Sequence, residues 1–106
     1  MSDQALSGKP ISVINVFRTT PEKQEATAEG IEQVCHRFMK KQPGFITAAV
    51  YRSFDGRRVA VHSQWESRQA FEQAFRNPEV LDALRQLLEV AQPEWHLYEL
   101  VYTTTG

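Results

Sequence analysis

Asn15 and Trp65 are the two residues whose type and position best suit chemistry in this chain. Asn15 shares a face of an apolar strand with Val13 and Phe17, where a polar side chain needs a hydrogen-bond partner or a ligand. Trp65 ends an alternating strand directly before a helix-start signal, so its indole could stack on a flat molecule while its N–H points at an oxygen. The two residues therefore indicate a site for a small aromatic ligand.

Arg85 is a third candidate, because its charge between Leu84 and Leu87 could lower the pKa of a bound phenol. Each candidate also has a structural interpretation. The Asn15 amide could bond nearby backbone, the indole of Trp65 could fill space between sheet and helix, and Arg85 could lie on a solvated helix face. The sequence leaves both interpretations open.

Metal and disulfide chemistry are not indicated. The three histidines, His36, His62 and His96, show no metal-ligand spacing, so we expect no metal site. Cys35 is the single cysteine, which rules out an internal disulfide and fits a reducing cytoplasm. Its place on an apolar helix stripe favours a small core residue.

Length and charge exclude several classes of protein. A chain of 106 residues forms one domain, and its formal charge of -1 comes from interspersed acidic and basic residues. No basic stripe exists, so nucleic acid is not an expected partner. No apolar run approaches the roughly 18 residues of a membrane span. We expect a flexible N-terminal arm over residues 1–10 and a folded domain over residues 11–106.

Hydrophobic periodicity predicts four strands and two helical regions. Alternation places the strands at residues 11–18, 45–52, 58–65 and 94–102. Helical spacing and capping signals give one helix from Thr20-Pro21 to Lys40-Lys41 and a second region from Glu66-Ser67 to Gln92-Pro93, broken at Asn77-Pro78. Asp55-Gly56 predicts a tight hairpin with positive φ values. The order β-α-β-β-α-β is the α+β, ferredoxin-like arrangement, an antiparallel sheet with helices on one face.

The other face of this sheet should carry apolar side chains. Ile14 and Val16 alternate with the core-facing residues of the first strand, and His62 lies on the face opposite Trp65. A large exposed apolar patch predicts association, and a two-fold dimer that packs sheet against sheet would cover it. We therefore expect a homodimer, with His62 at the interface rather than acting as a base.

From Ile11 to about Tyr102 the chain resembles the antibiotic biosynthesis monooxygenase family of the dimeric α/β-barrel superfamily. The segments that carry the resemblance are Asn15, Pro43-Gly44-Phe45, Asp55-Gly56, Gln64-Trp65-Glu66-Ser67, Ala70-Phe71 and Asn77-Pro78. The resemblance implies a dimeric α/β barrel and a cofactor-independent monooxygenase that oxidises a hydroquinone or polycyclic phenol to a quinone with O₂. It implies catalytic roles for Asn15, Trp65 and Arg85, and no cofactor.

We assign substrate contacts to the side chains expected around that site, namely Phe17, Val61, Ser63, Phe71 and Phe75. Val61 and Phe71 stand where the polyketide-tailoring branch of the family has an asparagine and a tyrosine. Their apolar character supports an alternative, a non-catalytic binder or sensor of a small aromatic metabolite. A third alternative is a haem-binding or haem-degrading protein. The haem-degrading branch is similar at Asn15, but Ala74 and Ala83 occupy the positions of its tryptophan and histidine ligand.

Overall fold

The computed structural model describes residues 9–88 and 92–106 of the chain. Within these ranges the elements, in order, are β1 (Ile11–Arg18), α2 (Gln24–Arg37), the 3₁₀ helix η1 (Met39–Lys41), β2 (Phe45–Arg52), β3 (Arg58–Trp65), α3 (Arg68–Ala74), α4 (Pro78–Leu88) and β4 (Gln92–Tyr98). Residues 1–8 of the expected N-terminal arm lie outside the described residues.

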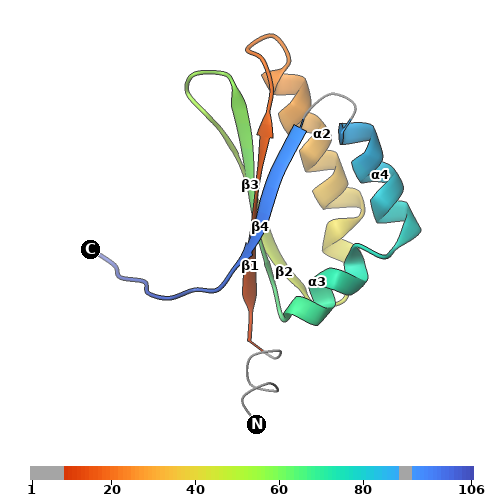
Figure 1. Ribbon diagram of the computed structural model, residues 1–106, viewed down its shortest axis with the longest axis vertical. Helices are drawn as coiled ribbons and strands as arrows, with labels where there is room; N and C mark the ends of the chain where they lie inside the picture. The colour runs from red at the N-terminus through yellow and green to blue at the C-terminus, as the bar shows by residue number, and fades with distance from the viewer. Residues whose placement is uncertain (1–8, 89–91) are drawn as a thin grey trace.

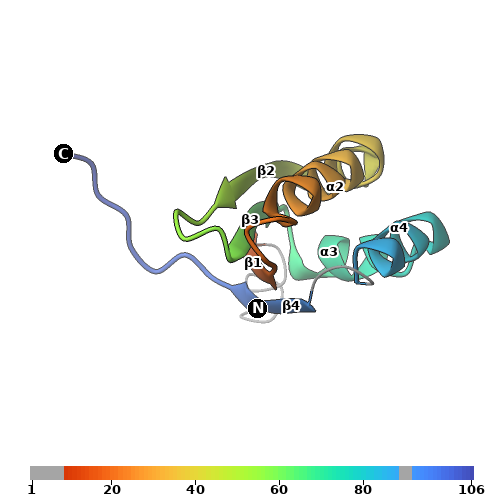
Figure 2. The same ribbon diagram turned by 90° about the horizontal axis from the view of Figure 1, so that it is seen from above.

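The strands form one antiparallel sheet in the order β2-β3-β1-β4. The three α-helices lie on one face of this sheet and leave the other face uncovered (Figure 1). Figure 2 shows the same two layers from above, with α2 and α4 side by side over the sheet. This confirms the α+β, ferredoxin-like fold.

Strand alternation sorts the side chains between the two faces. Val13 and Phe17 of β1 and Val59, Val61 and Trp65 of β3 are buried under the helices. The intervening residues point to the uncovered face, as the hydrogen bond between His62 Nε2 and Ser12 Oγ at 3.0 Å confirms. Because the period of a strand is two, this register fixes which side chains can reach a site between sheet and helices.

A β-bulge in β2 changes the phase of that strand. Phe45 pairs with Trp65, but Thr47 already pairs with Gln64, so Ile46 is the extra residue and is exposed. After the bulge the even-numbered residues, Ala48 and Val50, share the helix-covered face. Both the aromatic contact of Phe45 and the core-facing side chains of the later part of β2 depend on this irregularity.

The first helix is shorter than expected at both ends. It begins at Gln24 rather than at Thr20-Pro21, because Thr20 to Lys23 form a separate turn closed by a 2.9 Å bond from Lys23 N to Thr20 O. It ends at Arg37 because the backbone of Phe38 leaves the helical region, with φ at -120°. The 3₁₀ helix η1 covers the remaining expected helical residues.

The last strand also differs from its expected bounds of residues 94–102. It begins earlier, at Gln92, and ends at Tyr98, which pairs with Ser12 near the start of β1. In this register Glu99 would stand opposite Ile11, the first residue of β1, and Leu100 opposite Pro10, which offers no N–H. The segment 99–106 has no regular structure and leaves the sheet on the side away from the helices (Figure 1).

The hairpin between β2 and β3 forms where expected, but with a different turn. Gly56 has a φ of 78°, whereas Asp55 keeps a negative φ. The Asp55 carboxylate instead accepts bonds from Ser53 Oγ at 2.7 Å and from Arg57 N at 2.9 Å. These bonds, the Ser53 bond first, lower the pKa of the Asp55 carboxyl below its ordinary value.

Candidate active site

A cavity of about 40 Å³ lies between the sheet and the helices. The strands contribute Val13, Asn15, Phe17, Val61 and Ser63 to its wall. Opposite them, the helices and the residues at their ends contribute Ile31, Val34, Phe71, Phe75, Leu84 and Leu87. All five residues assigned to substrate contact from the sequence therefore line one cavity, together with Asn15.

The cavity is small for an aromatic guest. An engineered cavity of about 150 Å³ is large enough for benzene, so a ring enters the present space only if side chains in its wall move. Phe75 and Cys35 in that wall are half-buried, and Phe75 stands at the C-terminal end of α3. Phe45, Ala48 and Leu84 in the same wall are half-buried as well, so several of the lining side chains also reach the surface.

Asn15 places a polar group in this apolar space. Its Oδ1 is buried and finds no hydrogen-bond donor among the described residues. A buried amide oxygen without a donor costs about 1–3 kcal/mol relative to a satisfied one. The position therefore suits a ligand that donates an O–H or N–H to the carboxamide.

Ser63 is the second polar group of the sheet wall. Its Oγ accepts a hydrogen bond of 3.2 Å from the indole Nε1 of Trp65. Ser63 lies two residues along β3 from Val61, the residue that pairs with Asn15, so Asn15 and Ser63 are diagonal neighbours on one face. Such neighbours stand about 7–8 Å apart, whereas one oxygen that bonds two partners spans at most about 6 Å, so both side chains must extend toward a ligand oxygen that contacts the two of them.

Trp65 itself lies one layer behind the cavity wall. Its side chain is completely buried, and its ring meets Phe45 edge to face at 5.3 Å and Phe71 at 5.8 Å between centroids. Phe71 in turn contacts Phe75 at 4.5 Å. The expected stacking of the indole on a ligand does not follow from this geometry, because Trp65 is not part of the cavity wall, whereas its contacts Phe71 and Ser63 are.

Arg85 lies outside the site. Its side chain is 75% exposed, and it pairs with Asp82, with 4.0 Å between Nη1 and Oδ1. The expected charge contact with a bound phenol is therefore absent from this arrangement. Leu84 and Leu87 face the cavity instead, which turns Arg85 to the outer side of α4.

The described wall of the cavity carries no charged side chain. Its one ionisable group is the thiol of Cys35, and burial, with a smaller contribution from Glu32, raises the pKa of this thiol above its ordinary value. The thiol is therefore neutral at physiological pH. The described wall is therefore apolar apart from this thiol and the hydrogen-bonding side chains of Asn15 and Ser63.

Sequence reasoning assigned Phe71 and Phe75 at α3 to the wall but missed the contributions of α2, η1 and α4. Cys35 and Met39 line the cavity from α2 and η1, and Leu84 and Leu87 line it from α4. The apolar stripes of these two helices carry the signal, since a stripe facing a sheet must also face any cavity above that sheet.

No helix in residues 9–88 or 92–106 is long and apolar enough to cross a bilayer. Across the same ranges no three His, Cys, Asp or Glu side chains come together as metal ligands.

A one-sided antiparallel sheet with an apolar cavity under its helices defines a small domain of the ferredoxin-like class. The sequence pattern of the antibiotic biosynthesis monooxygenase family matches residues 10–93, and the chain belongs to this family.

Individual relatives agree with this assignment. Tetracenomycin-F1 monooxygenase of Streptomyces glaucescens is 29% identical over 83 residues, which are 78% of this chain and 74% of the relative. SnoaB, a cofactor-independent oxygenase of Streptomyces nogalater, has a similar fold, with a TM-score of 0.77 and 21% identity over 90% of this chain and 96% of SnoaB. Rv0793 of Mycobacterium tuberculosis has a TM-score of 0.76 and 18% identity over 92% of this chain and all of Rv0793.

Proposed function

We propose that the protein is a cofactor-independent monooxygenase that oxidises a hydroquinone or polycyclic phenol to a quinone with O₂. The observation that carries the proposal is the buried Asn15 Oδ1, an acceptor for which the described residues offer no donor, in the wall of an apolar cavity lined by Phe17, Phe71 and Phe75. A phenolic hydroxyl supplies the missing donor, and its ring suits the aromatic wall. Two oxygenases among the similar proteins support the reaction type.

The reaction balances without a further reductant. The substrate anion passes one electron to O₂, and the two radicals recombine as a hydroperoxide on a ring carbon. Loss of water then leaves a carbonyl at that carbon, so one oxygen atom stays on the product and the other departs as water. The ring supplies all four electrons that reduce O₂. The protein holds the ring, binds its oxygen and excludes bulk water.

The proton of the substrate hydroxyl has no strong base to receive it within the described wall, because Asn15, Ser63 and the neutral Cys35 thiol are its polar groups. We therefore propose that no protein group removes this proton, and that the pKa of the substrate hydroxyl alone sets how much of the anion forms. An apolar site disfavours the anion, so the bound phenol ionises at or above its solution pKa. Asn15 can serve both forms, because a half-turn of its amide replaces the oxygen with the NH₂ group.

Oxygen uptake tests the reaction directly. We expect enzyme-dependent consumption of O₂ with 1,4-naphthohydroquinone, above its uncatalysed oxidation and unchanged by a chelator or added flavin, with one atom of ¹⁸O₂ in the product and no release of H₂O₂. The kcat/KM should rise with pH and follow the pKa of the phenol when ring substituents change it. If kcat/KM instead rose at the same pH for every substrate, a base on the enzyme would be responsible, and the proposal would be contradicted.

The main alternative remains a non-catalytic binder of a small aromatic metabolite. It is favoured by the small volume of the cavity and by Val61 and Phe71, which add only apolar surface to its wall. Tight binding of a phenol without oxygen uptake would establish this alternative. The haem alternative is weaker, since the described wall of the cavity includes no histidine. A Soret shift on adding haemin would restore it.

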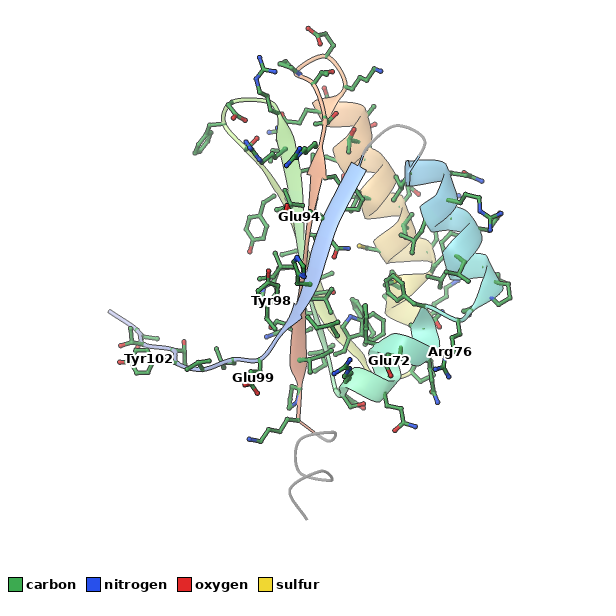
Figure 3. The ribbon with its side chains drawn as sticks, viewed as in Figure 1. Glu72, Arg76, Glu94, Tyr98, Glu99 and Tyr102 are labelled. Atoms are coloured by element: carbon green, nitrogen blue, oxygen red, sulfur yellow. The ribbon has the colours of Figure 1, made fainter. Side chains whose placement is uncertain are left out.

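We also propose that two copies associate through the uncovered face of the sheet, and that the protein works in the cytoplasm. Ile14 and Val16 are only partly buried there, and Tyr51 and Tyr98 are exposed. Figure 3 shows Tyr98 on the side of β4 away from the helices and Tyr102 near the free end of the C-terminal segment. Leu100, Val101 and Tyr102 of that segment are 72–88% exposed, an apolar run that a second copy would cover.

A further inference from the structure

We infer that Ser63 donates a hydrogen bond to the substrate oxygen, and that Trp65 acts on the substrate through Ser63 as a positioning residue. The inference rests on the proposed function and adds roles for two residues within the same site. Its starting observation is that Trp65 is completely buried and absent from the cavity wall, while its N–H bonds the one hydroxyl in that wall.

The chemistry of the two groups fixes the direction of the Ser63 hydroxyl. An indole N–H is a donor only, whereas a serine hydroxyl offers one donor and two acceptor lone pairs. The 3.2 Å bond from Trp65 Nε1 occupies one lone pair of Ser63 Oγ, so the hydroxyl proton must point elsewhere. Among the described residues no acceptor binds the Ser63 hydroxyl, and we place its proton toward the cavity whose wall Ser63 lines.

Asn15 and Ser63 then form a complementary pair. Asn15 Oδ1 needs a donor, and the Ser63 hydroxyl needs an acceptor. A phenolic hydroxyl is both, because it donates its proton and accepts through its oxygen. One such group between the two side chains satisfies both, whereas a carboxylate or a ketone can only accept and leaves the Asn15 oxygen unpaired.

The bond from Trp65 also strengthens the donor. Hydrogen bonds in a chain polarise one another, so a hydroxyl that accepts from an indole N–H donates better to a substrate oxygen. The benefit grows as negative charge develops on that oxygen, which is the direction of the proposed reaction. The buried indole therefore contributes to turnover without touching the ring.

Two ligands that differ by one hydroxyl test the inference without requiring turnover. We expect wild-type protein to bind 2-naphthol more tightly than naphthalene. Ser63→Ala should reduce the affinity for 2-naphthol by about three- to tenfold and leave naphthalene binding unchanged. Ser63→Thr, which keeps the hydroxyl, should restore the preference for 2-naphthol.

The Trp65 arm of the experiment separates positioning from packing. Trp65→Phe keeps an aromatic ring among Phe45 and Phe71 but removes the N–H donor. We expect it to weaken 2-naphthol binding, and to cause no further hydroxyl-dependent loss when combined with Ser63→Ala. Additive losses in the double variant would show that Trp65 acts independently of Ser63 and would overturn the inference.

A spectroscopic signal checks the contact itself. The indole N–H proton of Trp65, assigned by its disappearance in Trp65→Phe, should move upfield in Ser63→Ala and keep its position in Ser63→Thr. An unchanged resonance in Ser63→Ala would overturn the proposed bond.

The two proposals fail in different ways. Hydroxyl-dependent binding without oxygen uptake would refute the monooxygenase and support the Ser63 donor. Full oxygen uptake by Ser63→Ala would refute the Ser63 donor and leave the monooxygenase standing. Failure of wild-type protein to bind 2-naphthol at all would overturn the inference together with the site.

Discussion

Gly44 and Ala70 face each other so closely that a methyl group on Gly44 would overlap the side chain of Ala70. Gly44 also has a φ of 84°, and its carbonyl accepts a 2.7 Å bond from Glu66 N. The start of β2 thus packs directly against the segment that leads from Trp65 into α3. This contact limits how close α3, and with it Phe71, can lie to the sheet.

Gly44→Ala should lower the free energy of unfolding by about 2–5 kcal/mol, because it combines a left-handed backbone with overpacking. Gly56→Ala is a suitable comparison, since Gly56 has a similar φ of 78° but its nearest neighbours are Pro21 atoms at 3.3 Å. Urea denaturation of both variants measures the difference. Ala70→Gly should recover part of the loss in Gly44→Ala, and no recovery would contradict a direct clash.

Asn15→Leu should separate stability from function. Leucine has a similar size and removes the buried oxygen that lacks a donor, so we expect the free energy of unfolding to stay equal or rise by about 1 kcal/mol. We expect the kcat/KM for a hydroquinone to fall by about a hundredfold. Val13→Leu on the same strand face is the control for a change of packing. A variant that loses stability and activity together would assign Asn15 a structural role.

The sequence predicted the strands far better than the ends of the helices. The bounds of β1, β2 and β3 coincide with the expected ranges, because alternation is a local signal that burial of one face enforces. The start of α2 depended on a turn after Thr20 that competes with the capping signal. The end of β4 depended on the length of β1, which is information from another part of the chain.

The candidate site also contains positions that the sequence predicted and positions that it did not. Alternation along β1 and β3 was enough to place Asn15, Val61 and Ser63 beside one another. Residue spacing does not show how deeply Trp65 is buried or which side of α4 faces the sheet. The ligand contacts expected of Trp65 and Arg85 could therefore not be checked from the sequence. Trp65 lies behind Phe71, and Arg85 lies on the outer side of α4.

Tyr98→Glu should convert a dimer into a monomer. A carboxylate on the uncovered face of the sheet would be buried without a partner if two sheets pack together. Leu81→Glu is the matched control, because Leu81 on α4 is 42% exposed and Tyr98 is 43% exposed. Light scattering after size-exclusion chromatography measures the mass. A wild-type monomer at micromolar concentration would contradict the dimer, as would equal behaviour of the two variants.

Cys35 should resist alkylation until the pH is high. Burial raises the pKa of its thiol, so the folded protein holds little of the reactive thiolate at pH 8. We expect iodoacetamide to modify the folded chain at least about tenfold more slowly than the chain unfolded in urea. Mass spectrometry follows the reaction, and equal rates would show that the thiol is freely exposed.

The same shift makes stability depend on pH. Because the folded-state pKa of the thiol lies above its unfolded value of about 8.5, the contribution of Cys35 is complete below that value and is lost as the pH rises through the folded-state pKa. The urea midpoint of wild-type protein should therefore decline above pH 8 relative to that of Cys35→Ala. Parallel curves for the two proteins would remove Cys35 as the cause.

The bulge at Ile46 decides which changes in chain length β2 can accept. One residue fewer between Phe45 and Ala48 would restore a regular ladder, with Phe45 still opposite Trp65 and Ala48 still opposite Ser63. Two residues fewer would make Phe45 and Ala48 adjacent, and the strand would have to expose either the ring that meets Trp65 or the small residues that complete the cavity wall. Related chains should therefore lose one residue at the start of β2 but not two.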